Sequence, residues 1–447
     1  MATLEPNSLT PNEAFARLRR ERGCCWLDSG LGTGNLQRYS VLAARPSLTF
    51  RAWGPQLERI DAQGISTWSM GDSLAELEAE IKARASDSPF AGGAIGSFGY
   101  EFGRKLAGQT DPKGRAQHWP DFQFQFYSAV YVYNHENEIA SLRAVDDKQG
   151  QTELLALRRM LMLPPGQDGP VFAGQDFTAN RSQEDYCRAV DLIRDHIAAG
   201  DIYQANLAQF FSTTFQGDPA TLFNRLRRFN PAPYSAYLDF GARQILSSSP
   251  ELFLRVDDGK IITRPIKGTR PRGATEAEDD TCRRALLASS KERAELLMIV
   301  DMERNDLGRI AEYGSVRVNE LYHLESYATV HHLIGEVEAT LRPDVTLSEL
   351  LRATFPGGSI TGAPKLKAME IIAKLEPSPR DIFCGSLGWL GFNGDIELNI
   401  AIRTITCQEQ RADFGVGAGI VWDSKPEAEY EETLHKAKAL FAALKNQ

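Results

Sequence analysis

Alternation of apolar and polar residues with a period of two dominates the first third of the chain. Phe122, Phe124 and Phe126 alternate with glutamines, and Val130 and Val132 alternate with tyrosines. Successive side chains of a strand point to opposite faces, so this pattern predicts half-buried strands. The N-terminal part of the chain is therefore expected to be rich in strands.

Helical spacing appears after residue 180. Tyr186, Val190 and Ile193 recur at intervals of three and four, which places them on one stripe of a helix. Ser182 precedes them and has the side chain of an N-cap, while Gly200 follows them and is typical of a helix end. We expect a helix between these two residues.

A hairpin is predicted near the C-terminus. Asn393-Gly394, a strong signal for a tight turn, separates the apolar runs SLGWLGF and DIELNIAIRTIT. In the second run the isoleucines and leucine from Ile396 to Ile402 alternate with polar residues. The pattern predicts one continuous strand, with Arg403 on its polar face.

A Pro/Gly-rich stretch without periodicity, residues 163–175, is the best internal boundary. It separates a strand-rich region, 1–162, from a second region, 176–447, and we expect the two to pack as one intertwined unit. Helices and hairpins follow one another without a regular βαβ alternation. The pattern therefore predicts an α+β fold with mostly antiparallel sheet.

Composition narrows the possible functions. The chain has 447 residues, of which 42% are hydrophobic and 24% charged, and a formal net charge of −9. An acidic chain without a basic stripe is not expected to bind nucleic acid. It has neither an apolar signal segment nor an apolar run long enough to cross a membrane, and its six cysteines form no CxxC pair. We therefore expect a cytoplasmic globular protein with reduced thiols.

The segment RPIKGTRPRG, residues 264–273, carries the first candidate chemistry. Two prolines and two glycines bracket four cationic side chains, among them Lys267. A lysine held beside other cations on a stiff loop can have a lowered pKa and act as a nucleophile. The alternative is an ordinary solvated basic loop.

A second segment, FPGGSITGAPKLKAMEII, runs from a glycine-rich loop into a helix predicted to begin at Pro364. Backbone N–H groups at such a junction suit a carboxylate or phosphate, although the glycine spacing is not that of a P-loop. The alternative is a connection without a ligand.

Two further segments are predicted to be acidic helices. Glu292 and Glu295 share one helix face, and Glu429, Glu432 and Lys436 share another. Together the carboxylates could hold a hard cation such as Mg²⁺, whereas a zinc ligand set of His and Cys is missing from the sequence. The alternative is a pair of solvated charged faces.

A glycine-rich strand and a histidine pair complete the candidate chemistry. Gly415, Gly417 and Gly419 alternate in FGVGAGIVWDS, which indicates a ligand lying against bare backbone. His331 and His332 are adjacent and so cannot share one face of a strand. One of them is expected to be structural while the other faces a pocket.

Taken in order, these segments resemble the chorismate-using enzymes, namely anthranilate synthase, aminodeoxychorismate synthase, isochorismate synthase and salicylate synthase. The matching motifs span about 200 residues. They are SSPELF at 248–253, PIKGTRPRG, IVDMERNDLGRI, TVHHLIG, FPGGSITGAPKLKAMEII, IAIRT, GVGAGIV and EAEYEETLHKAKAL. The first half matches more loosely, through WLDSG, GGAIGSFGYE and GDIYQANLAQ. The resemblance implies large antiparallel sheets packed face to face with helices outside.

Within this family, alanine is typical of anthranilate synthases in the PIxGT motif, whereas PIKGT resembles component I of aminodeoxychorismate synthases. The resemblance implies that Lys267 attacks chorismate covalently and that Glu251 protonates the leaving hydroxyl. His332 matches the family's active-site histidine. The implied substrate-binding residues are Gly268, Thr269, Ser359, Arg403, Gly417, Ala418, Gly419 and Lys436. The implied Mg²⁺ ligands are Glu295 and Glu432, with Glu292 and Glu429 behind them.

Family members can also hold tryptophan near the N-terminal sheet. Ser29 of WLDSG, and Pro233 and Tyr234 of NPAPYSAY, match the two walls of that pocket. The resemblance further implies ammonia supplied by a separate glutamine amidotransferase, because none of the cysteines has a nucleophile-elbow context. Two alternatives stay open: an anthranilate synthase component I, and a non-catalytic subunit that binds chorismate or tryptophan.

Overall fold

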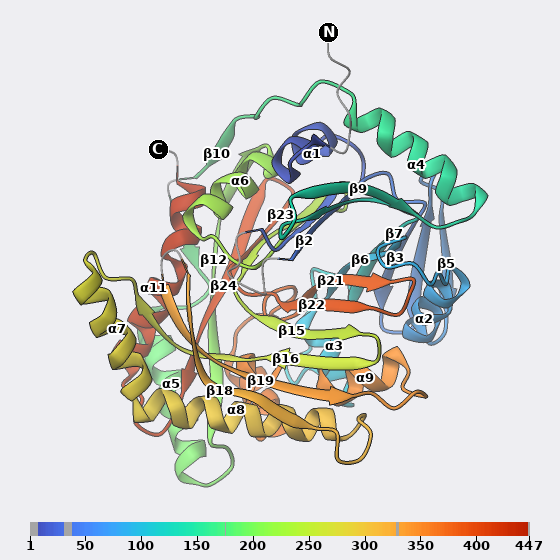
Figure 1. Ribbon diagram of the computed structural model, residues 1–447. Coiled ribbons are helices and arrows are strands. Elements are labelled where there is room, and N and C mark those ends of the chain that lie inside the picture. Colours follow the sequence, from blue (N-terminus) through green and yellow to red (C-terminus); the bar gives the residue numbers. More distant parts are fainter. Residues whose placement is uncertain (1–7, 31–37, 175, 328–329, 446–447) are drawn as a thin grey trace.

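The computed structural model describes residues 8–30, 38–174, 176–327 and 330–445. In this part of the chain every strand pair is antiparallel and the strands form two 12-stranded sheets (Figure 1). The expected α+β class with large antiparallel sheets is confirmed.

The first sheet has the order β10-β12-β24-β23-β14-β13-β1-β2-β8-β9, and β11 and β20 also pair with β12. Its strands are β1 (Cys25–Asp28), β2 (Tyr39–Ala43), β8 (Ala129–Asn134), β9 (Ile139–Ala144), β10 (Val171–Ala173), β11 (Thr178–Ala179), β12 (Gln204–Gly217), β13 (Tyr234–Asp239), β14 (Arg243–Ser249), β20 (Gly362–Ala363), β23 (Thr404–Gln408) and β24 (Arg411–Ile420).

The second sheet has the order β17-β19-β16-β15-β22-β21-β6-β7-β3-β4-β5, and β18 also pairs with β19. Its strands are β3 (Leu48–Trp53), β4 (Gln56–Asp61), β5 (Ser66–Met70), β6 (Gly93–Phe98), β7 (Phe122–Tyr127), β15 (Leu252–Asp257), β16 (Lys260–Arg264), β17 (Ile266–Pro271), β18 (Arg317–Ser326), β19 (Val330–Thr340), β21 (Ser386–Gly391) and β22 (Ile396–Ile400).

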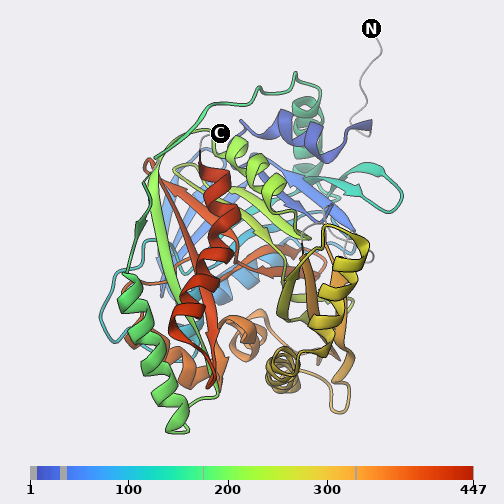
Figure 2. The same ribbon diagram turned by 90° about the vertical axis from the view of Figure 1, so that its left-hand side faces the viewer.

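Helices cover the outer faces of the sheets, with α5, α7, α8 and α11 gathered along one side (Figures 1 and 2). The helices of the described residues are α1 (Pro11–Leu18), α2 (Ser73–Ala83), α3 (Tyr100–Leu106), α4 (Lys148–Leu161), α5 (Gln183–Ala198), α6 (Pro219–Phe229), α7 (Glu276–Ala288), α8 (Ser290–Gly308), α9 (Leu347–Thr354), α10 (Lys365–Leu375) and α11 (Pro426–Leu444).

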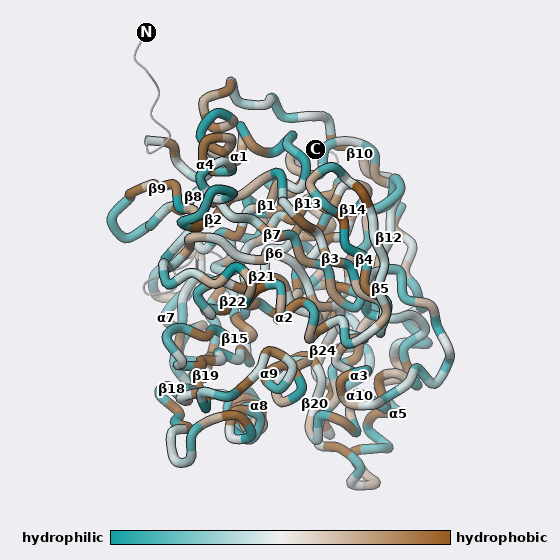
Figure 3. The backbone as a smooth tube through the Cα atoms, turned by 90° about the vertical axis from the view of Figure 1, so that its right-hand side faces the viewer, coloured by the Kyte–Doolittle hydropathy of each residue, from teal (hydrophilic) through white to brown (hydrophobic). Residues whose placement is uncertain are grey.

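One hydrophobic cluster joins the two sheets. It contains Val130 and Leu238 of the first sheet together with Ile95 and Trp389 of the second. Larger clusters fill the outer faces, where the sheets meet the helices, and hydrophobic segments run through the middle of the molecule (Figure 3). Since the sheet interface excludes water, both faces of β7 are buried, and its glutamines are not solvated as the alternation had predicted.

The chain crosses between the sheets several times, for instance from β2 to β3, from β7 to β8 and from β14 to β15. Strands from before and after residues 163–175 therefore lie in both sheets. The stretch itself contains β10, whose Val171 is buried, while its last residue lies outside the described part. A functional division of the chain at this stretch stays a prediction.

The predicted helix after residue 180 is confirmed as α5. The Ser182 hydroxyl accepts the N–H of Asp185 at 3.1 Å, and Gly200 follows the helix with φ +79°. The predicted hairpin is confirmed as β21 and β22, with Gly394 at φ +91° in its turn. Local sequence signals thus gave both elements correctly.

The continuous strand predicted after that turn is wrong. β22 ends at Ile400 in the second sheet, and β23 begins at Thr404 in the first. Between them Arg403 adopts φ +51°, a left-handed conformation that an uninterrupted strand does not contain. Residues 401–403 therefore carry the chain from one sheet to the other, and Arg403 lies at this crossing instead of on a strand face.

Two smaller boundaries also differ from the prediction. Pro364 is the N-cap of α10, and the helix begins one residue later. Lys267 lies in the short edge strand β17 and not in a loop. An edge strand tolerates the prolines at 265 and 271, because its outer N–H groups need no partner.

None of the described helices has the length and hydrophobicity needed to span a membrane.

Close packing of the second sheet gives a stability prediction. A Cβ on Gly96 of β6 would overlap Gln123 O and stand 2.7 Å from Phe124 Cα, both in the backbone of β7. Backbone atoms cannot move aside cheaply, so Gly96→Ala should lower the free energy of unfolding by about 1–3 kcal/mol, measured by denaturant unfolding. The matched control is Gly308→Ala at the end of α8, where a Cβ has open space. Equal effects of the two substitutions would contradict this account.

Candidate active site

Lys267 lies where β17 bends against β19. The pairing register shifts between Lys267 and Thr269, and Gly268 between them has φ +79°. A Cβ on Gly268 would approach Leu286 Cδ1 at 2.9 Å, so both the conformation and the space favour glycine here. This bulge turns the lysine side chain into the interior.

The Lys267 side chain is half-buried, and its ammonium lies among groups from four different segments. Its Nζ donates to the carbonyl oxygen of Ser359 at 3.2 Å. Burial lowers the pKa of Lys267, while the carboxylates of Glu295 and Glu251 oppose this and Lys436 adds to it. A buried amine with a lowered pKa is the kind of group that acts as a nucleophile.

Glu251 lies between β14 and β15, and its charge acts on Lys267. It is 5% exposed, and its Oε1 accepts the N–H of Ile266 at 3.4 Å. Burial raises the pKa of Glu251 to about 6, although the Ser359 hydroxyl and the Lys267 ammonium act in the opposite direction. At neutral pH part of the population therefore carries a proton that can be donated.

The two adjacent histidines have different surroundings, as the sequence had indicated. His331 is fully buried, and its Nε2 lies 2.9 Å from Asp279 of α7. His332 forms a 2.9 Å hydrogen bond through Nδ1 with the Thr269 hydroxyl beside Lys267. Burial lowers the pKa of His332 to about 4, with the charge of Arg403 adding to the effect, so this ring is neutral at physiological pH.

The alternating glycines of β24 lie beside β12. A Cβ on Gly419 would stand 2.5 Å from Gln204 Nε2 and 3.6 Å from Lys267 Nζ. One on Gly417 would stand 3.0 Å from Asn206 Oδ1. Ala418 points the other way, into the cluster beneath α5 and α10. Gly419 thus lies beside both Gln204 and Lys267, and a ligand against the backbone of these glycines stays a prediction.

Cations already face the predicted metal-binding glutamates on α8 and α11. Lys291 lies 3.9 Å from Glu295, Arg270 lies 3.3 Å from Glu292, and Lys436 lies 2.7 Å from Glu432. Glu429 instead accepts a hydrogen bond from Ser424 at 2.6 Å. Within the described part of the chain, no three His, Cys, Asp or Glu side chains form a ready-made metal site.

The glutamates nevertheless influence one another. Burial raises the pKa of Glu295 and of Glu429, and the charge of Glu432 contributes to both shifts. Burial acts on Glu432 in the same sense, but Lys436, Lys291 and Lys267 lower its pKa overall. The donor set is entirely carboxylate, which fits a hard cation such as Mg²⁺.

Arg403 and Lys436 lie on the remaining side of the candidate site around Lys267. The Arg403 guanidinium donates to the Lys436 carbonyl oxygen, and Lys436 Nζ donates to Gly417 O at 3.0 Å. Burial lowers the pKa of Arg403 to about 10, with Glu432 opposing the shift. These two partly buried cations, of which Lys436 also pairs with Glu432, suit an anionic ligand.

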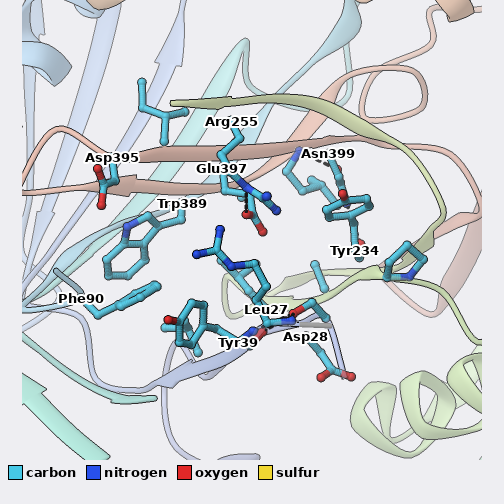
Figure 4. A pocket seen from close by; sticks show the side chains of 18 of the residues that line it. Leu27, Asp28, Tyr39, Phe90, Tyr234, Arg255, Trp389, Asp395, Glu397 and Asn399 are labelled. Atoms are coloured by element: carbon cyan, nitrogen blue, oxygen red, sulfur yellow. Dashed lines mark hydrogen bonds and ion pairs between the residues drawn. The ribbon is translucent and has the colours of Figure 1, made fainter. Parts of the chain in front are cut away.

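Ser29, Pro233 and Tyr234 lie elsewhere, in a cavity of about 270 Å³ between the sheets (Figure 4). Aromatic rings of Tyr39, Phe90 and Trp389 line one part of it (Figure 4). None of the residues around Lys267 lines this cavity. The structure therefore separates the predicted tryptophan pocket from the lysine site.

Comparisons with known proteins agree with this arrangement. Residues 23–442 match the family model described as chorismate binding enzyme. The chain belongs to the chorismate-binding enzyme family.

Among relatives in this family, aminodeoxychorismate synthase component 1 of Klebsiella aerogenes is 38% identical, over 97% of this chain and 96% of the relative. Anthranilate synthase component 1 of Pseudomonas putida is 36% identical, over 97% and 92%. The crystal structure of anthranilate synthase component I from Streptococcus pneumoniae has a TM-score of 0.79 and 32% identity, over 97% of this chain and 98% of that one.

Sequence reasoning about this chorismate-binding enzyme missed Gln204 and Lys291. Gln204 is 1% exposed, and its Oε1 has no hydrogen-bond partner among the described residues. Its signal was a polar residue at the start of the strand within GDIYQANLAQ, one of the motifs that carry the family resemblance. Lys291 lies one turn before Glu295, but spacing alone does not distinguish it from a surface lysine.

The neutral state of His332 gives a pH prediction. Its pKa is about 4 in the folded protein and near 6.5 when unfolded, so protonation favours unfolding. As the pH falls from 7 to 5, the free energy of unfolding should decrease by roughly 2 kcal/mol more in the wild type than in His332→Gln. Denaturant unfolding at both pH values measures this.

The matched control for that experiment is His323→Gln, which removes a half-exposed histidine of β18. It should keep the pH dependence of the wild type. If His332→Gln kept it as well, His332 would not be the titrating group.

Proposed function

We propose that this chain is the component of an aminodeoxychorismate synthase that replaces the C4 hydroxyl of chorismate with an amino group. The observation that carries the proposal is the buried Lys267 amine at the Ser359 carbonyl, next to a carboxyl group with a raised pKa. Relatives of that name match over nearly the whole chain.

In the proposed first step, the neutral Lys267 amine bonds to C2 of the ring. Both ring double bonds shift by one position, the C4–O bond breaks, and Glu251 donates its proton so that the hydroxyl leaves as water. In the second step ammonia bonds to C4, both double bonds shift back, the bond between C2 and Lys267 breaks, and a proton from the added nitrogen returns to Glu251. Dividing one difficult displacement into two easier ones is the usual advantage of covalent catalysis.

The walls of the site suit the two carboxylates of chorismate. Arg403 and Lys436, which lie beside each other and beside Gly417, would bind the enolpyruvyl carboxylate, and Thr269, Ser359 and the backbone of the β24 glycines would border the ring. His332 is neutral and held by Thr269, so it can orient the substrate but is not a strong acid. Such fixed donors position the ring without reorganising.

Glu295 and Glu432, with Glu292 and Glu429 behind them, would hold Mg²⁺. When bound, the ion supplies positive charge to the ring carboxylate. Without it, Lys291, Arg270 and Lys436 offset the negative charges of these side chains. On binding Mg²⁺, these glutamates would exchange their ion pairs with the three cations for the metal.

We also propose that a separate glutamine amidotransferase supplies the ammonia. A glutaminase of this kind needs a reactive thiolate, which requires a lowered thiol pKa. Here burial raises the pKa of Cys25 and of Cys384 to about 12, and it raises the pKa of Cys24, Cys187 and Cys407 as well. The designation "component 1" of the relatives is consistent with a second subunit.

The cavity between the two sheets is proposed to hold tryptophan (Figure 4). Its walls include Ser29, Pro233, Tyr234 and an aromatic group, and its volume suits a small aromatic molecule. The Ser29 hydroxyl donates to Tyr39 O at 2.6 Å and accepts the N–H of Tyr39 at 2.9 Å, so serine shapes this wall instead of offering a free donor.

Anthranilate synthase component I is the second candidate, because relatives of that name are 36% identical to this chain. Lys267 argues against it, since that reaction needs no lysine at this position. Product analysis separates the two functions.

One prediction of the proposed function concerns the product of the reaction. Incubation of the purified chain with chorismate, Mg²⁺ and ammonium should give aminodeoxychorismate, identified by mass spectrometry. Glutamine in place of ammonium should give no product, because the ammonia is proposed to come from a separate amidotransferase. Anthranilate together with pyruvate would reject the assignment, and turnover with glutamine alone would reject the separate amidotransferase.

Another prediction concerns Lys267 as the nucleophile. Lys267→Ala should abolish the chorismate adduct on the protein and lower kcat/KM by roughly 10³-fold or more, because the covalent route is lost. Lys260→Ala, which removes an exposed lysine of neighbouring β16, is the control and should keep the adduct. An adduct mass that persisted in Lys267→Ala would remove this lysine from the nucleophile's role.

A further inference from the structure

A buried ion pair outside the proposed chemistry lies directly behind the lysine's hydrogen-bond acceptor. Arg380 and Glu376 follow α10, and their side chains are 1% and 3% exposed. Arg380 Nε and Nη2 donate to the two carboxylate oxygens of Glu376 at 2.9 and 2.7 Å. This fork geometry fixes the plane of the guanidinium.

The other donors of Arg380 reach two backbone carbonyls. Nη1 donates to Ile360 O at 2.9 Å, and Nη2 donates to Asn206 O at 2.6 Å. Asn206 Nδ2 also donates to Ile360 O, at 3.2 Å. The carbonyl of Ile360 is therefore held by two side chains, one of them charged.

Further contacts hold Arg380 itself. Its guanidinium lies over the ring of Tyr100, 4.5 Å from the centroid, and its backbone N–H donates to Glu101 Oε1 at 2.7 Å. Glu376 Oε1 also accepts the N–H of Ala208 at 2.9 Å. Removing one partner of a buried arginine leaves charge uncompensated, so Arg380 has little freedom to move.

Ile360 ends the short 3₁₀ turn Gly358–Ile360, and the preceding residue is Ser359, whose carbonyl receives the Lys267 ammonium. The Thr361 hydroxyl closes the turn by donating to Gly357 O at 3.0 Å. Adjacent peptide units share one Cα, so fixing the carbonyl of Ile360 restricts that of Ser359.

We infer that Arg380 is a positioning residue for Lys267: it holds the 358–360 turn so that the Ser359 carbonyl meets the lysine amine. The same arginine holds β12 through Asn206, on the side where Gln204 borders the glycines of β24. Lysine at position 380 would keep the charge but not the planar fork that reaches Glu376 and both carbonyls.

Several charged groups face Lys267, and none of them is among the hydrogen-bond partners of Arg380 described above. They are Glu295 of α8, Lys436 and Glu432 of α11, and Glu251. The Ser359 carbonyl stabilises the ammonium form, so its displacement should make the amine lose its proton at lower pH. Displacement should also slow attack, because the amine is no longer held in line.

The experiment measures chorismate adduct formation without ammonium, by rapid mixing and mass spectrometry over a range of pH. It rests on the proposed function, since Lys267 must be the nucleophile. In Arg380→Lys the rate should fall by roughly 10- to 100-fold, while chorismate affinity stays close to that of the wild type. The midpoint of the pH profile should move about one unit towards acid.

A second variant covers the possibility that Arg380→Lys does not fold, which circular dichroism detects. Asn206→Ala removes the neutral donor to the same carbonyl without leaving a buried charge unpaired. It should shift the rate and the midpoint in the same direction but less. The matched control is Arg352→Lys on α9, where an exposed arginine donates to Leu106 O at 3.0 Å, and it should behave as the wild type.

The outcomes are distinct. A wild-type rate and midpoint in folded Arg380→Lys, or in Asn206→Ala if the first variant does not fold, would overturn the inference. A smaller amplitude with unchanged rate and midpoint would also overturn it, because only the folded fraction would have changed. Absence of an adduct in the wild type itself would reject the proposed function, and the inference with it.

Discussion

The burial of one lysine amine is the constraint on which the rest of the site depends. An ammonium group removed from water is costly unless oxygen atoms face it, and here a backbone carbonyl and two nearby carboxylates do so. Each of these partners must in turn be held in place. The 358–360 turn is fixed by Arg380 and Asn206, Glu251 by the N–H of Ile266, and Glu295 by its position on α8. The packing of four distant segments thus follows from the need to offset a single charge.

The topology explains how such distant segments meet. The chain passes repeatedly between two antiparallel sheets, and the crossings place residues of β14–β15, β17, β24 and α11 around the same point. Arg403 lies at one of these crossings, in a left-handed conformation between β22 and β23. A residue at a crossing belongs to neither sheet's ladder, so its side chain is free to face the site.

Local signals were enough to predict elements whose cause is local. Ser182 and Gly200 delimit α5, and Asn393-Gly394 gives the turn between β21 and β22. The break after Ile400 was not predictable from alternation, because the apolar face continues unchanged while the chain moves to another sheet. The importance of Lys267 could be inferred from its motif, but its place in an edge strand depends on pairing with β19, which lies about 65 residues away. The roles of Arg380 and Gln204 could not be predicted from the sequence, because they depend on long-range contacts and not on spacing.

Burial also explains why an acid and a nucleophile can act together at one pH. In water a glutamate has lost its proton and a lysine has kept its own across the neutral range. Removal from water disfavours both charged forms, so it raises the pKa of Glu251 to about 6 and lowers that of Lys267. Their mutual attraction limits both shifts. The two shifts have opposite directions, and each favours the form that the proposed first step uses, a protonated carboxyl and a neutral amine. One physical cause, acting with opposite sign on an acid and a base, supplies both reactive groups that the proposed first step requires.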